Sequence, residues 1–268
     1  MSARKLACII GWPVAQSLSP AIHNAAFEAL GLDWTYVPLA VRPGAIEEGV
    51  HLMNEMGAQG ANVTMPHKQA IVPYLERLEG DAETLGAVNT IIREGSSLIG
   101  HNTDGPGFLT ALREEARFEP KGKHCLILGG GGAARAVALA LTIEGADVVV
   151  SARRPEQAAE LTSIAARIET APWGTTIQAD LVVNATPSRE GLPLDSMRFG
   201  PNVVAADLIY VPPETAFLEA ARAAGATAVD GLGMLVHQAA LSFRLWTGVN
   251  APLEVMAQAA RAAAAASG

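Results

Sequence analysis

Short apolar runs alternate along the chain with longer stretches that mix apolar and polar residues. The short runs are typical of buried strands, and the stretches between them are typical of helices. Strands that alternate with helices imply right-handed crossovers and a mostly parallel sheet, so the pattern predicts an α/β fold. The expected strands are residues 6–10, 34–39, 61–64, 87–92, 98–100, 125–128, 147–150, 180–184, 203–208 and 227–229.

Turn and cap residues mark the boundaries of the expected helices. Ser19 before Pro20 predicts an N-cap followed by a proline in the first turn, and Gly31 predicts the end of that helix. Residues 94–97 predict a hairpin turn. The expected helices are residues 20–30, 45–56, 106–116 and 133–144, one that begins at Pro66, one that begins at Pro155, and final helices from residue 237 onward.

The expected strands fall into two sets, which predicts two domains. The strands before residue 104 form a complete α/β unit, and a second set begins at residue 125. We expect one domain at residues 1–104 and another at residues 105–236. The final helices, residues 237–268, follow the last strand and are expected to return to the first domain.

The strand at residues 125–128 runs directly into four glycines and an alanine-rich helix. Gly129, Gly131 and Ala134 have the spacing G-x-G-x-x-A. Glycines allow a sharp turn and the close approach of a pyrophosphate, and the small third residue lets helix and strand pack closely. The helix start offers free N–H groups to the phosphates. The pattern indicates a Rossmann-like dinucleotide-binding domain, although the motif alone also fits a plain glycine-rich turn.

The next strand of this domain lacks the acidic residue that normally holds the ribose of NAD. Its end reads Ser151, Ala152, Arg153, Arg154. A guanidinium suits a ribose 2′-phosphate, so the expected cofactor is NADP. The alternative is a pair of solvated arginines at the start of a helix, where positive charge opposes the helix dipole.

Composition narrows the class of protein. A net charge of −8 argues against nucleic acid and anionic membranes as partners. No apolar stretch is long enough to cross a bilayer, and the histidines and cysteines lack metal-ligand spacing, so we expect no metal. Cys8 and Cys125 lie in apolar runs and are expected to be buried thiols, as in a reducing compartment. These features favour a soluble, cytoplasmic protein.

Polar residues gather where the expected strands of the first domain end. Ligands of open α/β sheets bind beyond these strand ends, and the groups there suit a polyhydroxylated ligand. Most have a structural alternative: Ser19 as a cap, Lys68 as a surface lysine and Thr64 as a strand residue. Asn89, Asn102 and Asp104 have the alternative of turn residues. We expect His67 and His101 to face solvent and leave both out of the site. The candidates are Ser17, Ser19, Asn62, Thr64, Lys68, Asn89, Asn102 and Asp104.

Taken together, these segments resemble the shikimate dehydrogenase family. The order and spacing of eight segments is more specific than any single one, and the match covers nearly the whole chain. The segments are SLSP at 17–20, ANVTMPHK at 61–68, GAVNT at 86–90, NTDG at 102–105, GGGGAAR at 129–135, NATP at 184–187, DLIYVPPET at 207–215 and DGLGMLVHQA at 230–239.

The resemblance implies a two-domain, NADP-dependent enzyme that interconverts 3-dehydroshikimate and shikimate in aromatic amino-acid biosynthesis. It implies that Lys68 and Asp104 are catalytic and flank the reacting oxygen. The implied substrate-binding residues are Ser17, Ser19, Thr64, Asn89, Tyr210 and Gln238. The implied cofactor-binding residues are Gly129, Gly131, Gly132, Ala133, Ala134, Arg153, Arg154, Asn184, Ala185, Thr186 and Gly231.

One departure from the family pattern is visible. Many members have Asn-Arg-Thr where this chain reads Ala152-Arg153-Arg154, which leaves NADP favoured and the adenosine contacts open. Two other functions stay open: a dehydrogenase that accepts quinate as well as shikimate, and a non-catalytic NADP-binding sensor. A non-enzymatic interaction module fits the polar strand ends poorly. The expected assembly is a monomer or a homodimer.

Overall fold

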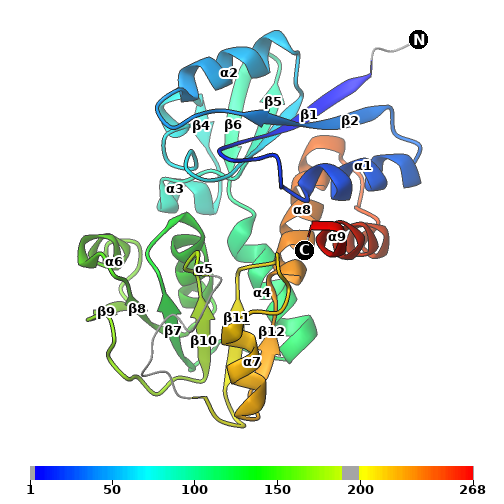
Figure 1. The fold of residues 1–268 in the computed structure, drawn as a ribbon. Helices are drawn as coiled ribbons and strands as arrows, with labels where there is room; N and C mark the ends of the chain where they lie inside the picture. Colours follow the sequence, from blue (N-terminus) through cyan, green and yellow to red (C-terminus); the bar gives the residue numbers. More distant parts are fainter. Residues whose placement is uncertain (1–3, 189–198, 268) are drawn as a thin grey trace. The chain divides into compact units, whose positions relative to one another are not determined.

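The computed structural model describes residues 4–188 and 199–267, and these form two compact units (Figure 1). Unit 1 consists of the chain up to Thr103 together with Gln238–Ser267, and unit 2 is Asp104–His237. The chain therefore passes from one unit to the other twice. Helix α8, Gly231–Thr247, contains the second passage.

Unit 1 contains a mixed six-stranded sheet in the order β2-β1-β3-β5-β6-β4. Strand β1 pairs in parallel with both β2 and β3, whereas β5 is antiparallel to β3 and to β6. The expected hairpin is confirmed, with Gly95 at a positive φ of 61° in its turn. The strands are β1 Lys5–Gly11, β2 Trp34–Ala40, β3 Gly60–Val63, β4 Arg77–Leu78, β5 Thr90–Glu94 and β6 Ser97–His101.

The last two helices contribute to the core of unit 1. Helix α9 packs against α1, and aromatic side chains of α1, β2 and α8 form one cluster. Trp246 of α8 donates its indole N–H to the carbonyl of Ile91 at 2.9 Å, and Gly60 leaves room for its ring. The helices are α1 Ser19–Ala29, α2 Ile46–Glu55, the 3₁₀ helix η1 Val72–Tyr74, α3 Asp81–Leu85 and α9 Leu253–Ser267.

Unit 2 contains a fully parallel six-stranded sheet in the order β12-β11-β10-β7-β8-β9. The strand order reverses between β7 and β10, which is where Rossmann-type sheets bind dinucleotides. Apolar clusters cover both faces of the sheet. The elements are α4 Asp104–Ala116, β7 His124–Leu128, α5 Gly132–Ile143, β8 Asp147–Ser151, α6 Pro155–Thr162, β9 Ile168–Ala171, β10 Leu181–Asn184, β11 Val204–Asp207, α7 Ala216–Ala223 and β12 Thr227–Val229.

Three local predictions were wrong. Ser19 is the first residue of α1 rather than its N-cap; the N-cap is Leu18, and Ser17 Oγ accepts the N–H of Ser19 at 3.3 Å. Pro66 opens no helix, because the segment after β3 closes in turns, with the N–H of His67 bonded to the carbonyl of Thr64. The final helical region begins at Gly231, earlier than expected. Strands β4 and β9 and helices α3 and α7 were not expected.

Among the described residues, no helix combines the length and apolar character that a membrane span requires.

Candidate functional site

Several candidate residues of unit 1 lie at one edge of its sheet. Thr64 directly follows β3, which runs parallel to β1. Asn89 precedes β5, and because β5 is antiparallel to β3, its start meets the end of β3. The N–H of Val63 donates to the carbonyl of Asn89 at 2.8 Å, which joins the two segments. This edge is where ligands of α/β sheets bind.

The side chain of Asn89 is buried, and its orientation is fixed by hydrogen bonds. Its Oδ1 accepts the backbone N–H of Thr103 at 2.8 Å and the hydroxyl of Thr90 at 2.8 Å. Its Nδ2 lies 2.9 Å from Thr103 Oγ1 and 3.4 Å from Oε1 of Gln238. A backbone N–H can only donate, so Oδ1 is the acceptor and Nδ2 is the donor. Asn89 and Gln238, two predicted substrate-binding residues, therefore lie together.

Lys68 lies in the turns after β3 and is partly buried. Its carbonyl accepts the N–H of Val88 at 2.7 Å, which places the backbone of Lys68 next to the segment that carries Asn89. The preceding residue, His67, is 1 % exposed, and its Nε2 donates to the carbonyl of Val41 at 2.7 Å. The expectation that His67 faces solvent is therefore wrong. His67 instead anchors the backbone next to Lys68.

The two candidate serines lie at the start of α1, after β1. Ser17 is partly buried, and Ser19 is 4 % exposed. The backbone N–H of Ser19 donates to Oγ of Ser17 at 3.3 Å, which links the two serines. Gly11, at the end of β1, has no side chain, and this leaves room for the methyl group of Thr64.

A buried group of hydroxyl and amide side chains lies under this edge. Asn62 was expected near the ligand, but its side chain points into this group. Its Oδ1 accepts the hydroxyl of Tyr36 at 2.7 Å, and its Nδ2 donates to the Asn89 carbonyl at 3.1 Å. The same Nδ2 lies 3.3 Å from Thr90 Oγ1 and 3.0 Å from Ser242 Oγ. Sequence reasoning missed Tyr36, Thr90 and Ser242, because a hydroxyl in a strand or helix gives no local signal.

Asn102 and Asp104 flank Thr103 at the passage between the units. Asn102 donates its Nδ2 to the carbonyl of Ala87 at 3.0 Å, so it ties a turn, which was the alternative to a ligand contact. Asp104 is the first residue of α4 and of unit 2, and it is 5 % exposed. His101 lies partly buried, 3.5 Å from a carboxylate oxygen of Glu79, rather than facing solvent as expected.

The glycine-rich segment of unit 2 forms the turn between β7 and α5. Gly129 has a φ of 112°, and a Cβ there would lie 2.8 Å from the carbonyl oxygen of Ala185. Gly131 is the N-cap of α5 and is exposed; a Cβ there would have no atom within 4 Å. In the described part of the chain, no side-chain cap bond is made at this helix start. Ala134 is fully buried where α5 packs on the sheet, and Gly132 and Ala133 form the first turn.

Two arginines follow β8, the strand next to β7. Arg153 and Arg154 are exposed, and within the described part of the chain no hydrogen bond or ion pair engages either guanidinium. No acidic residue stands between the end of β8 and this pair. Positive charge is therefore available beside a helix start whose backbone is open.

The remaining candidates of unit 2 lie at the ends of β10, β11 and β12. Asn184 is fully buried; its Nδ2 donates to both carboxylate oxygens of Asp207 at 3.1 Å, and its Oδ1 accepts from Thr186. Burial raises the pKa of Asp207. Asn184 thus holds the loop with Ala185 and Thr186 in place. Tyr210 lies partly buried after β11, and Gly231 begins α8, where a Cβ would lie 2.7 Å from the carbonyl oxygen of Ile209.

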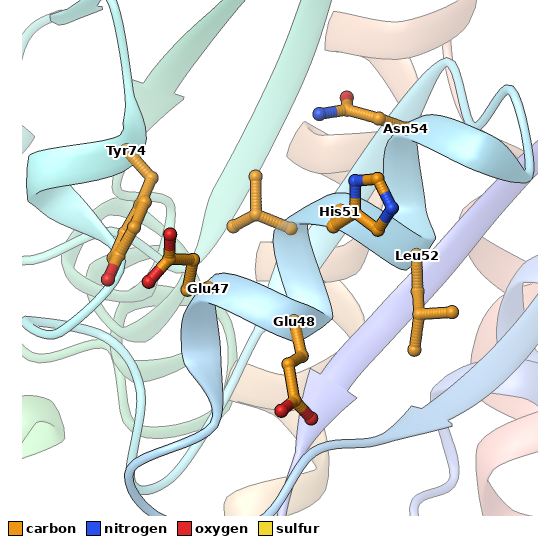
Figure 2. A pocket seen from close by; sticks show the side chains of 7 residues that line it. Glu47, Glu48, His51, Leu52, Asn54 and Tyr74 are labelled. Atoms are coloured by element: carbon orange, nitrogen blue, oxygen red, sulfur yellow. The ribbon is translucent and has the colours of Figure 1, made fainter.

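A surface hollow of about 610 Å³ lies elsewhere, on α2 (Figure 2). The predicted site residues do not line it. Within the described ranges, no three His, Cys, Asp or Glu residues cluster in a way that could hold a metal ion. The lining residues are Glu47, Glu48, Val50, His51, Leu52, Asn54 and Tyr74.

Three family models match the chain. The shikimate dehydrogenase substrate-binding domain matches residues 9–91, a putative NAD(P)-binding domain matches residues 117–191, and the shikimate 5′-dehydrogenase C-terminal domain matches residues 231–261. The first match lies in unit 1 and the second in unit 2, while the third covers the second passage between the units.

Whole-chain comparisons point the same way. The shikimate dehydrogenase (NADP(+)) of Methanopyrus kandleri is 46% identical and covers 94% of this chain and 93% of its own length. The Thermus thermophilus shikimate 5-dehydrogenase, solved with NADP(H) and shikimate, is 38% identical with a TM-score of 0.89 over 97% of this chain and 99% of its own. The quinate dehydrogenase of Corynebacterium glutamicum, solved with NAD, is 30% identical with a TM-score of 0.85. The match covers 95% of this chain and 98% of that structure's chain. Likeness of this extent in sequence and structure shows that the chain belongs to the shikimate dehydrogenase family.

Proposed function

We propose that this chain is an NADP-dependent shikimate dehydrogenase, which reversibly reduces 3-dehydroshikimate to shikimate. The observation that carries the proposal is the likeness, along almost the whole chain, to proteins named shikimate dehydrogenase (NADP(+)). Because that likeness includes both the substrate-binding and the NAD(P)-binding family models, it supports a complete catalyst rather than a binding module.

The choice of NADP rests on unit 2. The free N–H groups at the start of α5, next to the open backbone of Gly131, fit a pyrophosphate. The guanidiniums of Arg153 and Arg154, which are exposed and have no partner among the described residues, fit a ribose 2′-phosphate. When bound there, NADP supplies the hydride donor or acceptor. The cofactor-binding residues are those of the glycine turn, the arginine pair, the Asn184–Thr186 loop and Gly231.

The substrate is held by neutral polar groups of unit 1, with Tyr210 as a further contact. Ser17 and Ser19 donate hydroxyl hydrogens to the substrate carboxylate, and Thr64 adds a third hydroxyl. The amides of Asn89 and Gln238 bind ring hydroxyls, with Nδ2 as the donor end of Asn89 because its Oδ1 accepts from Thr103 and Thr90. A substrate with one carboxylate and several hydroxyls suits this set of donors and acceptors.

Lys68 and Asp104 act on the oxygen that changes charge. As the ketone is reduced, negative charge develops on its oxygen, and the Lys68 ammonium stabilises that charge and can supply the proton. Asp104 orients the hydroxyl and favours the charged form of the lysine. Asn89 connects the two segments: Val88 bonds the Lys68 carbonyl, and Asn89 bonds Thr103, the residue before Asp104. The protein thus positions and polarises the substrate.

A second candidate function is oxidation of quinate as well as shikimate. It is favoured by the likeness to the Corynebacterium glutamicum quinate dehydrogenase. The first assay therefore measures reduction of NADP⁺ and of NAD⁺ with purified protein on shikimate, quinate and related hydroxy acids. Fast turnover of shikimate with NADP⁺ supports the proposal, preferred turnover of quinate supports the second candidate, and cofactor binding without turnover of any of these compounds contradicts both.

The proposed setting is the cytoplasm, with a monomer or homodimer acting on small molecules. The buried, unpaired cysteines Cys8 and Cys125 support a reducing compartment. Nucleic acids and membranes are not proposed as partners, because the net charge is −8.

A further inference from the structure

We propose that the hydroxyl of Tyr36 is a positioning group for the substrate side of the site. It acts through the amide of Asn62 and, beyond that amide, on Asn89. This inference rests on the proposed function, because the residues that it positions are the proposed substrate contacts. The group of Tyr36, Asn62, Thr90 and Ser242 is called the buried polar cluster below.

The ring of Tyr36 is held rigidly in unit 1. It is 2 % exposed and stacks on the imidazole of His23, with ring centroids 4.5 Å apart and planes 13° apart. The side chain of Asn24 bonds both the N–H and the carbonyl of Tyr36, at 2.8 and 2.9 Å. Burial lowers the pKa of His23 to about 3, so this ring is neutral. The phenol oxygen therefore has a fixed position.

The hydrogen of this phenol sets the direction of the hydrogen bonds that follow. Burial raises the pKa of Tyr36 well above its usual value, so the phenol keeps its hydrogen. The hydrogen is donated to Oδ1 of Asn62 at 2.7 Å. With Oδ1 occupied as an acceptor, Nδ2 of Asn62 must face the other way, toward the carbonyl of Asn89 and the hydroxyls of Thr90 and Ser242.

The cluster then holds both the backbone carbonyl and the side-chain oxygen of Asn89. Asn62 holds its backbone carbonyl at 3.1 Å, and Thr90 donates to its Oδ1 at 2.8 Å. The Asn89 amide is thereby oriented with Nδ2 as its donor end, toward Thr103 and Gln238. The phenol of Tyr36 thus acts on Asn89 through one intervening amide, that of Asn62.

Ser242 links the same cluster to α8. Its Oγ lies 3.0 Å from Nδ2 of Asn62 and 2.8 Å from Oγ1 of Thr90. It also donates to the carbonyl of Gln238, one helical turn earlier, at 3.0 Å. The Gln238 side chain is itself within 3.4 Å of Asn89. A change in the cluster therefore reaches Gln238 as well as Asn89.

The test is Tyr36→Phe, which removes one oxygen atom and keeps the ring. The variant loses the hydrogen bond from Tyr36 to Asn62, which positions Asn89. This loss should raise KM for shikimate by about three- to tenfold. KM for NADP⁺ and kcat should change by less than about twofold, because the reacting groups are untouched. The matched control is Tyr74→Phe, a partly exposed tyrosine of η1 in the same unit, which should leave all three values unchanged.

A double-mutant cycle separates positioning from a general loss of stability. The effect of Ser242→Ala on KM should be smaller in the Tyr36→Phe background than in the wild type, because both side chains bond the amide of Asn62. A lower melting temperature with unchanged KM, or additive effects in the cycle, would overturn the proposal.

A second pair of variants keeps the test decisive if Tyr36→Phe does not fold. Ser242→Ala removes the α8 branch of the cluster and should also raise KM for shikimate. Thr247→Ala is its control, since Thr247 makes the same bond to a carbonyl one turn earlier, at 2.8 Å, outside the cluster. Equal effects of Ser242→Ala and Thr247→Ala on KM for shikimate would contradict the proposal. If the wild type oxidises another hydroxy acid instead of shikimate, the proposed function fails, and the same comparison is made with that compound.

Discussion

The backbone N–H of Thr103 donates to Oδ1 of Asn89 at 2.8 Å. This bond fixes Oδ1 as the acceptor end of the Asn89 amide and Nδ2 as its donor end. Asn89→Asp keeps the acceptor and the shape but replaces the NH₂ group by an oxygen. It should raise KM for shikimate by about ten- to a hundredfold, the cost of an unpaired buried polar group.

Steady-state kinetics with varied shikimate measure this effect. Asn54→Asp is the control, because Asn54 lies at the surface on α2 and its Oδ1 accepts from Arg93, a bond that aspartate retains. An unchanged KM in Asn89→Asp would remove this residue from the substrate site.

The arginine pair after β8 should decide between NADP and NAD. Arg153→Ala removes a guanidinium that has no partner within the described residues, so little stability should be lost. A charge-assisted hydrogen bond is worth roughly 1.5–3 kcal/mol, so affinity for NADP should fall about ten- to a hundredfold. Affinity for NAD, which lacks the 2′-phosphate, should hardly change.

Fluorescence titration with NADPH and NADH measures both affinities. Arg167→Ala is a suitable control in unit 2, since Arg167 is exposed and pairs with Asp147. Equal losses for the two cofactors in Arg153→Ala would refute the role of this residue in choosing NADP.

Local signals in the sequence predicted the cofactor-binding part of the site better than the substrate-binding part. The turn from β7 through Gly129 and Gly131 into α5 is encoded by adjacent residues, and it was predicted closely. The Tyr36–Asn62 and Asn62–Ser242 bonds join residues 26 and 180 positions apart. No local pattern marks such partners, because they meet only after the sheet and α8 have packed.

The wrong predictions have a related cause. A proline after a strand suits the first turn of a helix, but the carbonyl of Thr64 is taken by the N–H of His67 in a turn. The predicted cap at Ser19 is wrong because the hydroxyl of Ser17 accepts the N–H of Ser19 and Leu18 is the N-cap. In both cases a hydrogen bond between neighbouring residues outweighed the local preference.

Glu115 should make the folded protein less stable at higher pH. Its carboxylate lies against Gly233 of α8, a position with no side chain. Although Glu115 is exposed as a whole residue, partial burial of its carboxylate against α8, with Asp230 and Glu114 nearby, raises its pKa from 4.5 to about 7. Between these two values the folded state binds more protons than the unfolded state, so stability falls as pH rises. Glu115→Gln should remove this part of the pH dependence.

Thermal unfolding compares the variants below pH 4.5 and above pH 7. Glu115→Gln should melt at a higher temperature than the wild type above pH 7, with a smaller difference at low pH. The control is Glu169→Gln, a change at an exposed carboxylate on β9. The interpretation fails if the wild type and Glu115→Gln lose stability equally across this range.

The last prediction separates an enzyme from a binding scaffold and concerns Lys68 and Asp104. If both act on the oxygen that becomes charged, their strongest interactions exist in the transition state. Lys68→Ala should then lower kcat and kcat/KM together, by about 10²- to 10⁴-fold, with cofactor affinity nearly unchanged. Asp104→Asn should show a related loss.

The double variant tests whether the two residues work as a unit. Lys68→Ala with Asp104→Asn should lose much less activity than the product of the two single losses, because removing either partner already disables the other. Rapid-quench measurement of a single turnover isolates the chemical step from product release. Lys121→Ala is the control, since Lys121 is exposed in the loop before β7. A folded Lys68→Ala protein that turns over shikimate at the wild-type rate would remove this lysine from the mechanism and leave Asp104 to act without it.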